Sequence, residues 1–225
     1  MTTEELISSL APERPGSLKT RPDGTILDGH HRIHVPRGRG IGVDTLPREV
    51  IGKRWRIEFS MRNDVYWVDG PWPGKLAMSA RPRGGDWLPD EIARWKGLGI
   101  NAIFSLLTPD EERDLDLLAE AQESRRVGLS FVTFPIEDRG VPKSEVELNK
   151  MLTRATDMLS SSQNVLVHCR QGIGRSGLFA ACLLVRAGMN PSAAVDSLSA
   201  TRGLAIPETS EQRSWIERYA PAMTK

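Results

Sequence analysis

Apolar residues recur with the period of a strand in several short segments of the chain. Residues 55–61 alternate apolar and polar side chains, as a half-buried strand does. Further strands are predicted at KLAMSA (75–80), NAIFSLL (101–107), LSFVTF (129–134) and NVLVH (164–168). The unbroken apolar run in NAIFSLL indicates a strand covered on both faces of a sheet.

The segments between these strands are predicted to form helices. One helix is predicted between Asp86 and Gly99, with a proline in its first turn. A Thr-Pro-Asp-Glu capping box at Thr108 opens a helix that Gly128 ends, and a second capping box at Ser144 opens another. Strands that alternate with helices predict an α/β fold, in which a parallel-rich mixed sheet carries helices on both faces. Ligands bind such sheets at the carboxyl ends of the strands.

Composition separates the first part of the chain from the rest. Residues 1–52 are rich in proline, glycine and arginine and show little apolar periodicity, so we expect an extension that cannot build a core alone. The globular domain is then expected over residues 53–225, and 39% hydrophobic residues in a chain of 225 suffice for its core. Thirty basic and 29 acidic residues leave a net charge of +1, which provides no global field to recruit nucleic acid or an anionic membrane.

A short motif stands out within the extension. GTILDGHHRIHV predicts a short strand, a turn and the start of a helix. Its DGHHR stretch resembles the signature of ParB-like and sulfiredoxin-like domains, which implies a glycine turn and an arginine that bind a nucleotide phosphate. Pro36 and the nearby glycines interrupt the helix expected after Arg32. This favours a remnant or a docking segment over a working nucleotide site.

Cysteine usage bears on the compartment. The chain has only Cys169 and Cys182, without CxxC spacing, which argues against a disulfide scaffold or a zinc knuckle and fits a reducing compartment. No cationic stretch followed by an apolar run opens the chain, and no window approaches the roughly 18 apolar residues of a membrane span. We therefore expect a cytoplasmic protein with no membrane partner, no metal and no other cofactor. The common role of a lone cysteine is a small buried hydrophobe.

The surroundings of Cys169 indicate another role. Cys169 follows a predicted strand directly and precedes a glycine-rich turn and an apolar helix, an arrangement that binds anions through backbone N–H groups and the helix dipole. Thiols at helix N-termini and beside cations ionise more readily than free ones, so Cys169 is the predicted nucleophile. The predicted phosphate-binding residues are Arg170, Gln171, Gly172, Ile173, Gly174 and Arg175.

Three neighbours of this loop have predicted roles. The planar guanidinium of Arg175 can hold two phosphoryl oxygens, most tightly as charge builds in the transition state. Ser176 can donate its hydroxyl to the Cys169 sulfur and so stabilise it as a leaving thiolate, although a helix cap is the alternative. His168 is expected to hold the loop through its ring N–H groups rather than to act as a base, because it lies inside the strand end.

The motif His168-Cys169-x5-Arg175-Ser176 resembles the HC-x5-R-[ST] signature of the cysteine-dependent protein tyrosine and dual-specificity phosphatases at every defining position. The resemblance spans about residues 65–215. It implies a phosphocysteine mechanism without metal, and a general acid on a loop roughly thirty residues upstream of the cysteine. Asp138 in FPIEDRGVP is the expected acid, since small bacterial dual-specificity-like members carry an aspartate before RGVP. Glu137 is the competitor, and a turn-forming role is the alternative for Asp138.

The resemblance also implies a polar residue near the C-terminus that positions water. Gln212 is the candidate. Because Thr209 and Gln212 also fit a capping box, both roles stay open for Gln212.

These features favour a hydrolase that removes phosphate from phosphotyrosine, and from phosphoserine or phosphothreonine if its specificity is dual. The expected partner is a phosphotyrosine-containing protein or peptide. A phosphatase of inositol lipids or RNA ends on the same fold is the first alternative, although lipid-directed members favour lysines in the loop and this loop has only Arg170 as an extra cation. A phosphate-binding module without catalysis is another, but such modules usually lack the cysteine, the arginine or the acid. The last is a partition-type binder of DNA or nucleotides through DGHHR, against which the near-neutral charge argues.

Overall fold

The computed structural model describes residues 7–8, 11, 18–20, 26–28, 46–50 and 65–219. Its contacts divide the chain into two compact units, Met1–Asn63 and Asp64–Lys225. The division lies past the boundary between residues 52 and 53 that composition indicates. The strand expected over residues 55–61 lies outside the described residues, and the first strand of the second unit begins at Val65.

The described part of the first unit contains a small sheet. Its strands are β1 (Lys19–Thr20), β2 (Ile26–Asp28) and β3 (Glu49–Val50), in the order β2-β1-β3. Strand β2 overlaps the strand predicted before the DGHHR motif. Residues 29–32 of that motif lie outside the described residues.

A five-stranded sheet forms the centre of the second unit. Its order is β4-β5-β8-β6-β7, with β4 antiparallel to β5 and all other neighbours parallel. This confirms the predicted parallel-rich mixed sheet. The strands are β4 (Val65–Val68), β5 (Leu76–Ala80), β6 (Ala102–Ser105), β7 (Ser130–Thr133) and β8 (Val165–Cys169). The last four match the predicted strands within two residues at each end, whereas β4 is too short for its alternation to be recognised in the sequence.

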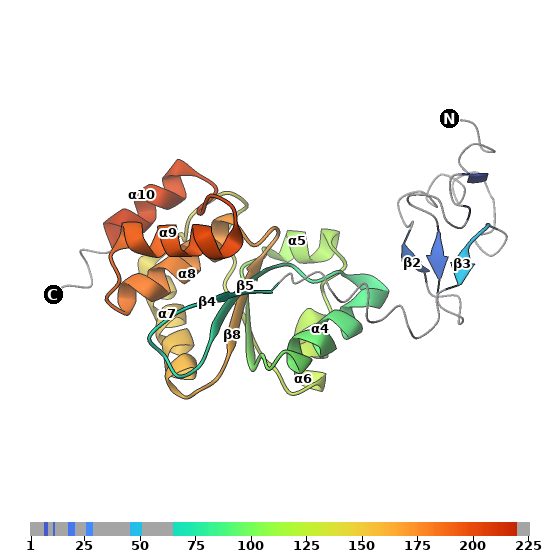
Figure 1. The fold of residues 1–225 in the computed structure, drawn as a ribbon, viewed down its shortest axis with the longest axis horizontal. Helices are drawn as coiled ribbons and strands as arrows, with labels where there is room; N and C mark the ends of the chain where they lie inside the picture. Colours follow the sequence, from blue (N-terminus) through green and yellow to red (C-terminus); the bar gives the residue numbers. More distant parts are fainter. Residues whose placement is uncertain are drawn as a thin grey trace. The chain divides into compact units, whose positions relative to one another are not determined.

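Helices cover both faces of this sheet. Figure 1 shows α4 and α6 together on one side and α7, α8, α9 and α10 on the other. The helices are η3 (Gly85–Trp87), α4 (Leu88–Gly97), α5 (Pro109–Asp114), α6 (Glu120–Arg126), α7 (Glu145–Ser160), α8 (Gly174–Arg186), α9 (Pro191–Arg202) and α10 (Ser210–Tyr219). Among the described residues, no helix has the length and apolar character needed to cross a membrane.

Strand alternation assigns the central side chains to two cores. Ile103 and Leu166 pack with Trp95 under α4, whereas the next residue of each strand, Phe104 and Val167, packs in the core with α7 and α8. All four strand side chains are fully buried, so the middle strands are apolar on both faces, as NAIFSLL predicts.

The prediction of one continuous helix between Thr108 and Gly128 is wrong. Two short helices, α5 and α6, occupy this interval. Asp116 adopts a left-handed conformation with φ of 54° between them, which aspartate tolerates better than most residues. The turn buries Leu117 in the same core cluster as Trp95, so burial of this leucine outweighs the helical propensity of the interval.

Candidate active site

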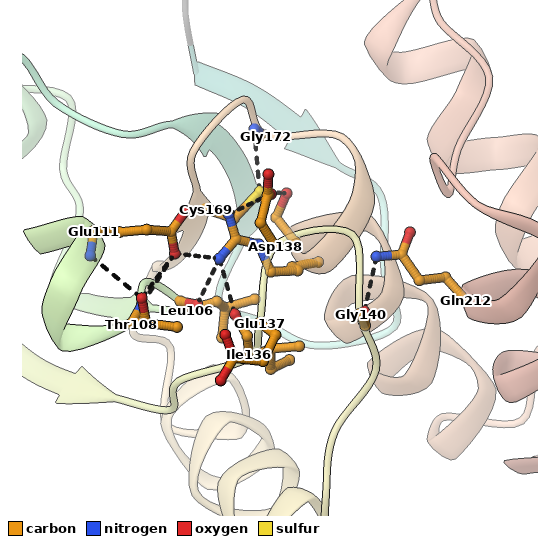
Figure 2. Close-up of polar contacts among 12 residues, drawn as sticks. Leu106, Thr108, Glu111, Ile136, Glu137, Asp138, Gly140, Cys169, Gly172 and Gln212 are labelled. Atoms are coloured by element: carbon orange, nitrogen blue, oxygen red, sulfur yellow. Dashed lines mark hydrogen bonds and ion pairs between the residues drawn. The ribbon is translucent and has the colours of Figure 1, made fainter. Parts of the chain in front are cut away.

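Cys169 is the last residue of β8, the middle strand of the sheet. It pairs with Ala80 of β5 and is 3% exposed. Its Sγ accepts a hydrogen bond from the N–H of Gly172 at 3.3 Å and lies 3.4 Å from Ser176 Oγ, in a contact where either atom can donate (Figure 2). Residues 169–175, here called the anion-binding loop after their predicted role, therefore curl around the sulfur. Ser176 thus lies next to Cys169, and the predicted donation of its hydroxyl to a leaving thiolate stays a prediction.

Gly172 is required for the course of this loop. Its φ is +70°, and a Cβ at this position would lie 2.5 Å from the backbone carbon and oxygen of Ser79. Both the left-handed conformation and the close approach of β5 exclude a side chain. The loop is thus held against the end of a neighbouring strand.

Arg175 lies in the first turn of α8 and points back under the loop. It is 1% exposed, and its two terminal nitrogens lie 2.6 and 2.8 Å from the carboxylate oxygens of Glu111. Nη1 also donates to the carbonyl oxygen of Ile136 at 2.9 Å. Burial disfavours the charged guanidinium, but the hydrogen bonds to Glu111 and the charges of Cys169, Glu111 and Asp138 outweigh it and raise the pKa of Arg175. The side chain is a permanent, oriented cation.

Glu111 is the site residue that sequence reasoning missed. It was recognised only as a member of the capping box, which the structure confirms: Glu111 accepts from the N–H of Thr108 and donates its own N–H to the Thr108 hydroxyl. Burial acts to raise the pKa of Glu111, but hydrogen bonds from Arg175 and Thr108 and the charges of Arg175 and Arg170 lower it below its ordinary value. The available signal was position, because Glu111 follows the carboxyl end of β6 and Cys169 lies at the carboxyl end of the neighbouring parallel strand β8.

Asp138 lies on residues 134–142, which follow β7 and are here called the acid loop after the predicted role of Asp138. Its Oδ1 is 2.9 Å from Nη2 of Arg175, and its side chain is 53% exposed (Figure 2). The competing carboxylate, Glu137, is 64% exposed and pairs with Lys143 at 3.1 Å. The fold thus brings Asp138 rather than Glu137 to the anion-binding loop.

His168 does not hold the loop as predicted. Strand alternation directs its side chain away from Cys169 into the core beside Trp95, with ring centroids 5.7 Å apart. Its Nε2 lies 3.0 Å from Glu120 Oε1 of α6, although neither ring nitrogen has hydrogen-bond geometry to a partner. The ring supports the strand from the opposite face.

Arg202 supports the loop from outside. This residue of α9 donates to the carbonyl oxygens of Gly172 and Gln171 at 3.2 and 3.1 Å, and its guanidinium lies 4.0 Å from the Tyr66 ring centroid. These bonds hold two loop carbonyl oxygens toward α9, while the N–H of Gly172 donates to the Cys169 sulfur. The side chains of Arg170 and Gln171 are exposed at the rim, and Ile173 packs against the core.

Gln212 is fully buried at the start of α10. The predicted capping box forms, with Gln212 N–H donating to the Thr209 hydroxyl at 3.2 Å and Thr209 N–H donating to the side-chain oxygen at 3.3 Å. The side-chain nitrogen donates to the carbonyl oxygen of Gly140 in the acid loop at 2.9 Å (Figure 2). The role in positioning water stays a prediction.

Comparison with known proteins decides the family. Residues 79–189 match the family model described as "Polymorphic toxin system, DSP-PTPase phosphatase". The second unit is a tyrosine and dual-specificity phosphatase domain. The matched residues of this phosphatase domain run from the end of β5 to the end of α8, and so include Glu111, Asp138, Cys169 and Arg175.

Individual relatives agree with this assignment. The chain is 26% identical over 155 residues to protein 197R of Invertebrate iridescent virus 6, whose name describes a candidate tyrosine phosphatase, with 67% of this chain and 54% of the relative covered. It is 29% identical over 126 residues to human cyclin-dependent kinase inhibitor 3, with 55% of this chain and 59% of the relative covered. The chain therefore spans between half and two thirds of the length of these relatives.

A solved structure supports the fold. The crystal structure of kinase associated phosphatase, with its catalytic-site cysteine substituted by serine, superposes with a TM-score of 0.66 at 24% identity and covers 71% of this chain and 94% of that one.

Within the described residues of the phosphatase domain, no group of three or more His, Cys, Asp and Glu side chains is placed to hold a metal ion.

Proposed function

We propose that this protein hydrolyses phosphotyrosine in proteins or peptides, and phosphoserine or phosphothreonine if its specificity is dual, through a phosphocysteine intermediate. The observation that carries the proposal is the convergence of Cys169, Arg175 and Asp138 at one edge of the sheet, with Asp138 2.9 Å from Arg175. The chemistry requires these three groups as nucleophile, anion holder and proton donor.

Substrate binding replaces one contact of the free protein. Nη2 of Arg175 donates hydrogen bonds to the carboxylates of both Glu111 and Asp138. A phosphoryl group held by the loop N–H groups and Arg175 takes the place of Asp138 on the guanidinium, while Glu111 keeps Arg175 in orientation. The half-exposed Asp138 carboxyl then lies beside the leaving oxygen.

In the first step the thiolate of Cys169 attacks phosphorus. The S–P bond forms as the bond from phosphorus to the tyrosine oxygen breaks, and Asp138 as a carboxylic acid gives its proton to that oxygen. Tyrosine leaves as the neutral phenol. Arg175 and the loop N–H groups stabilise the charge on the equatorial oxygens.

In the second step water attacks the phosphocysteine. Asp138, now a carboxylate, takes a proton from the water as the new P–O bond forms. The S–P electron pair returns to Cys169, and the Ser176 hydroxyl, 3.4 Å from the sulfur, donates to the thiolate as it leaves. Inorganic phosphate is released and the site is restored.

A substrate with a second phosphate, such as an inositol lipid, is the second candidate. Arg81 and Arg170 meet beside the loop, where the N–H of Arg81 donates to the carbonyl oxygen of Arg170 at 3.5 Å. Burial and the charge of Arg170 lower the pKa of Arg81, as expected for two cations close together. A second phosphate would neutralise this pair.

A substrate panel tests the proposal. Wild type and Cys169→Ser are assayed for phosphate release from phosphotyrosine, phosphoserine and phosphothreonine peptides, phosphoinositides and 5′-phosphorylated RNA. We expect the highest kcat/KM on phosphotyrosine peptides and no turnover by Cys169→Ser. A preference for phosphoinositides would favour the second candidate, and turnover by Cys169→Ser would exclude the covalent mechanism.

We propose that the protein acts in the cytoplasm, because both cysteines are free, which fits a reducing compartment. Each of the reacting side chains comes from residues 64–225, so the extension of residues 1–52, with its partial likeness to a ParB-like domain, is proposed to dock a partner and to take no part in the chemistry.

A further inference from the structure

Residues 206–212, here called the bridging segment, lie against the start of α8. A Cβ at Gly174 would lie 3.0 Å from the side-chain oxygen of Gln212 and 3.1 Å from its nitrogen, and a Cβ at Gly177 would meet Ile206. The two glycines of α8 thus allow the bridging segment to pack on the helix turn that carries Arg175. This contact fixes the bridging segment relative to the anion-binding loop.

The bridging segment also holds the acid loop. The amide nitrogen of Gln212 donates to the carbonyl oxygen of Gly140 at 2.9 Å, and the Thr209 hydroxyl donates to that of Arg139 at 3.5 Å. Arg139 itself adopts φ of 59°, in a turn closed by the Gly140 N–H donating to the Glu137 carbonyl oxygen at 2.9 Å. Asp138 lies inside this turn.

The capping role of Gln212 does not explain why its side chain ends in an amide, whose nitrogen donates to Gly140. A capping box is completed equally well by glutamate or glutamine, because only a side-chain oxygen is needed. The bond to Gly140 needs an N–H donor, which glutamate lacks. The donor is also fully buried, so its loss leaves the Gly140 carbonyl oxygen facing an oxygen instead.

Two contacts therefore hold the turn of residues 137–140 from opposite ends. Arg175 binds the carboxylate of Asp138 and the carbonyl oxygen of Ile136 at the start of the turn, and Gln212 binds Gly140 at its end. When a phosphoryl group displaces Asp138 from Arg175, the contact with Gln212 remains. It then keeps the carboxyl close to the leaving oxygen.

We propose that Gln212 is a positioning residue that holds the acid loop through Gly140, so that Asp138 stays over Cys169 during proton transfer. The proposal rests on the proposed phosphatase function. It differs from the water-positioning role that the family resemblance implies, because it acts on the step in which the tyrosine oxygen leaves.

The test compares Gln212→Glu with wild type on two leaving groups. The variant keeps the capping oxygen and removes the donor. We expect kcat to fall roughly tenfold or more on a phosphotyrosine peptide, since small misplacements of a reacting group cost up to about 100-fold. The loss should be much smaller on p-nitrophenyl phosphate, whose acidic leaving group needs little protonation. In an Asp138→Ala background, Gln212→Glu should have no further effect.

Controls separate positioning from stability. Asn190→Ala removes a comparable cap on α9, where the Asn190 side chain accepts from the N–H of Ser192 at 2.9 Å, and should leave the ratio of the two rates unchanged. Gln212→Leu serves as a second variant if the glutamate variant does not fold. Hydrogen exchange of residues 137–140 should accelerate in both Gln212 variants, whether or not the protein turns over phosphotyrosine.

Four outcomes would overturn the proposal, three in kinetics and one in hydrogen exchange. Equal losses on the two substrates would show that the acid step is not involved. Additive losses with Asp138→Ala would show independent action. A burst of product followed by slow turnover would place Gln212 in hydrolysis of the phosphocysteine and so restore the water role. Absence of wild-type turnover on every phosphate ester would instead refute the proposed function, while unchanged exchange at residues 137–140 would still refute the positioning contact.

Discussion

Substitution of Glu111 by glutamine tests whether the orientation of Arg175 depends on a buried carboxylate. Glu111→Gln removes the charge and turns one of the two acceptors, 2.6 and 2.8 Å from the guanidinium, into a donor. Removing one partner of a buried ion pair costs about 3–5 kcal/mol. We expect the lower end, about 3 kcal/mol, because Arg175 retains Asp138 and the Ile136 carbonyl oxygen. For a domain of this size, that corresponds to a fall in Tm of roughly 6–12 °C.

Turnover should fall with stability. A guanidinium without Glu111 is free to move away from the phosphoryl oxygens, and loss of one oriented donor costs about 10²–10³ in kcat. Thermal unfolding followed by circular dichroism and kcat on p-nitrophenyl phosphate measure the two effects. Asp110→Asn is the matched control, since Asp110 is the preceding residue, is 84% exposed and pairs with Arg113 across one helix turn. An unchanged Tm together with unchanged kcat in Glu111→Gln would refute the reasoning.

The same substitution has a pH dependence with a defined sign. The folded pKa of Glu111 lies below its ordinary value of 4.5, so its ionised form stabilises the folded state. This contribution is complete above pH 4.5 and is lost as the pH falls through the lower folded pKa. The difference in Tm between wild type and Glu111→Gln should therefore be largest near neutral pH and shrink below pH 4.5. A difference that grows on acidification would contradict the ion pair.

The remaining predictions concern the reacting groups. Cys169→Ser should abolish turnover and keep binding of a phosphate analogue such as sulfate, measured by steady-state rates and by titration. Cys182→Ala should retain turnover, because burial and the charge of Glu145 raise the pKa of Cys182 and keep it a thiol. Asp138→Ala should lower kcat on phosphotyrosine by about 10²–10⁴ and should lower it less on a substrate with an acidic leaving group; equal losses on both substrates would contradict the role as acid. The variant should also bind vanadate more tightly, because Arg175 loses a competing anion. Peroxide should inactivate the protein and EDTA should not, so recovery of EDTA-treated activity by zinc would count against the mechanism.

Most of the fold could be predicted because its strands are unusually apolar. NVLVH and NAIFSLL carry enough buried side chains to define their own faces, and the helix starts at Thr108 and Ser144 have local caps. The break at Asp116 could not be predicted, since it depends on burial of Leu117 in a core cluster that Trp95 of another helix shares. Local propensity contains no information about such a distant partner.

The candidate site divides in the same way. Cys169, Arg175 and Ser176 lie within one contiguous motif, where the strand, the loop and the helix dictate their relative positions. Glu111 belongs to another segment, 64 residues from Arg175, and its capping role hides its second contact. The contacts of the His168 ring could not be predicted from the motif, because they depend on strand alternation, which turns neighbouring side chains to opposite faces, and on Trp95 of another helix.

The strand order has a further consequence for how the site fails under stress. Cys169 terminates the central strand, paired on both sides, whereas the acid loop extends from β7 at the edge of the sheet. Edge elements open by local fluctuations at lower free energy than central ones. Gradual warming should therefore first produce a protein that is still alkylated at Cys169 and still cleaves activated esters, but no longer processes phosphotyrosine. Turnover of phosphotyrosine would therefore be lost at a lower temperature than the reactivity of the Cys169 thiol.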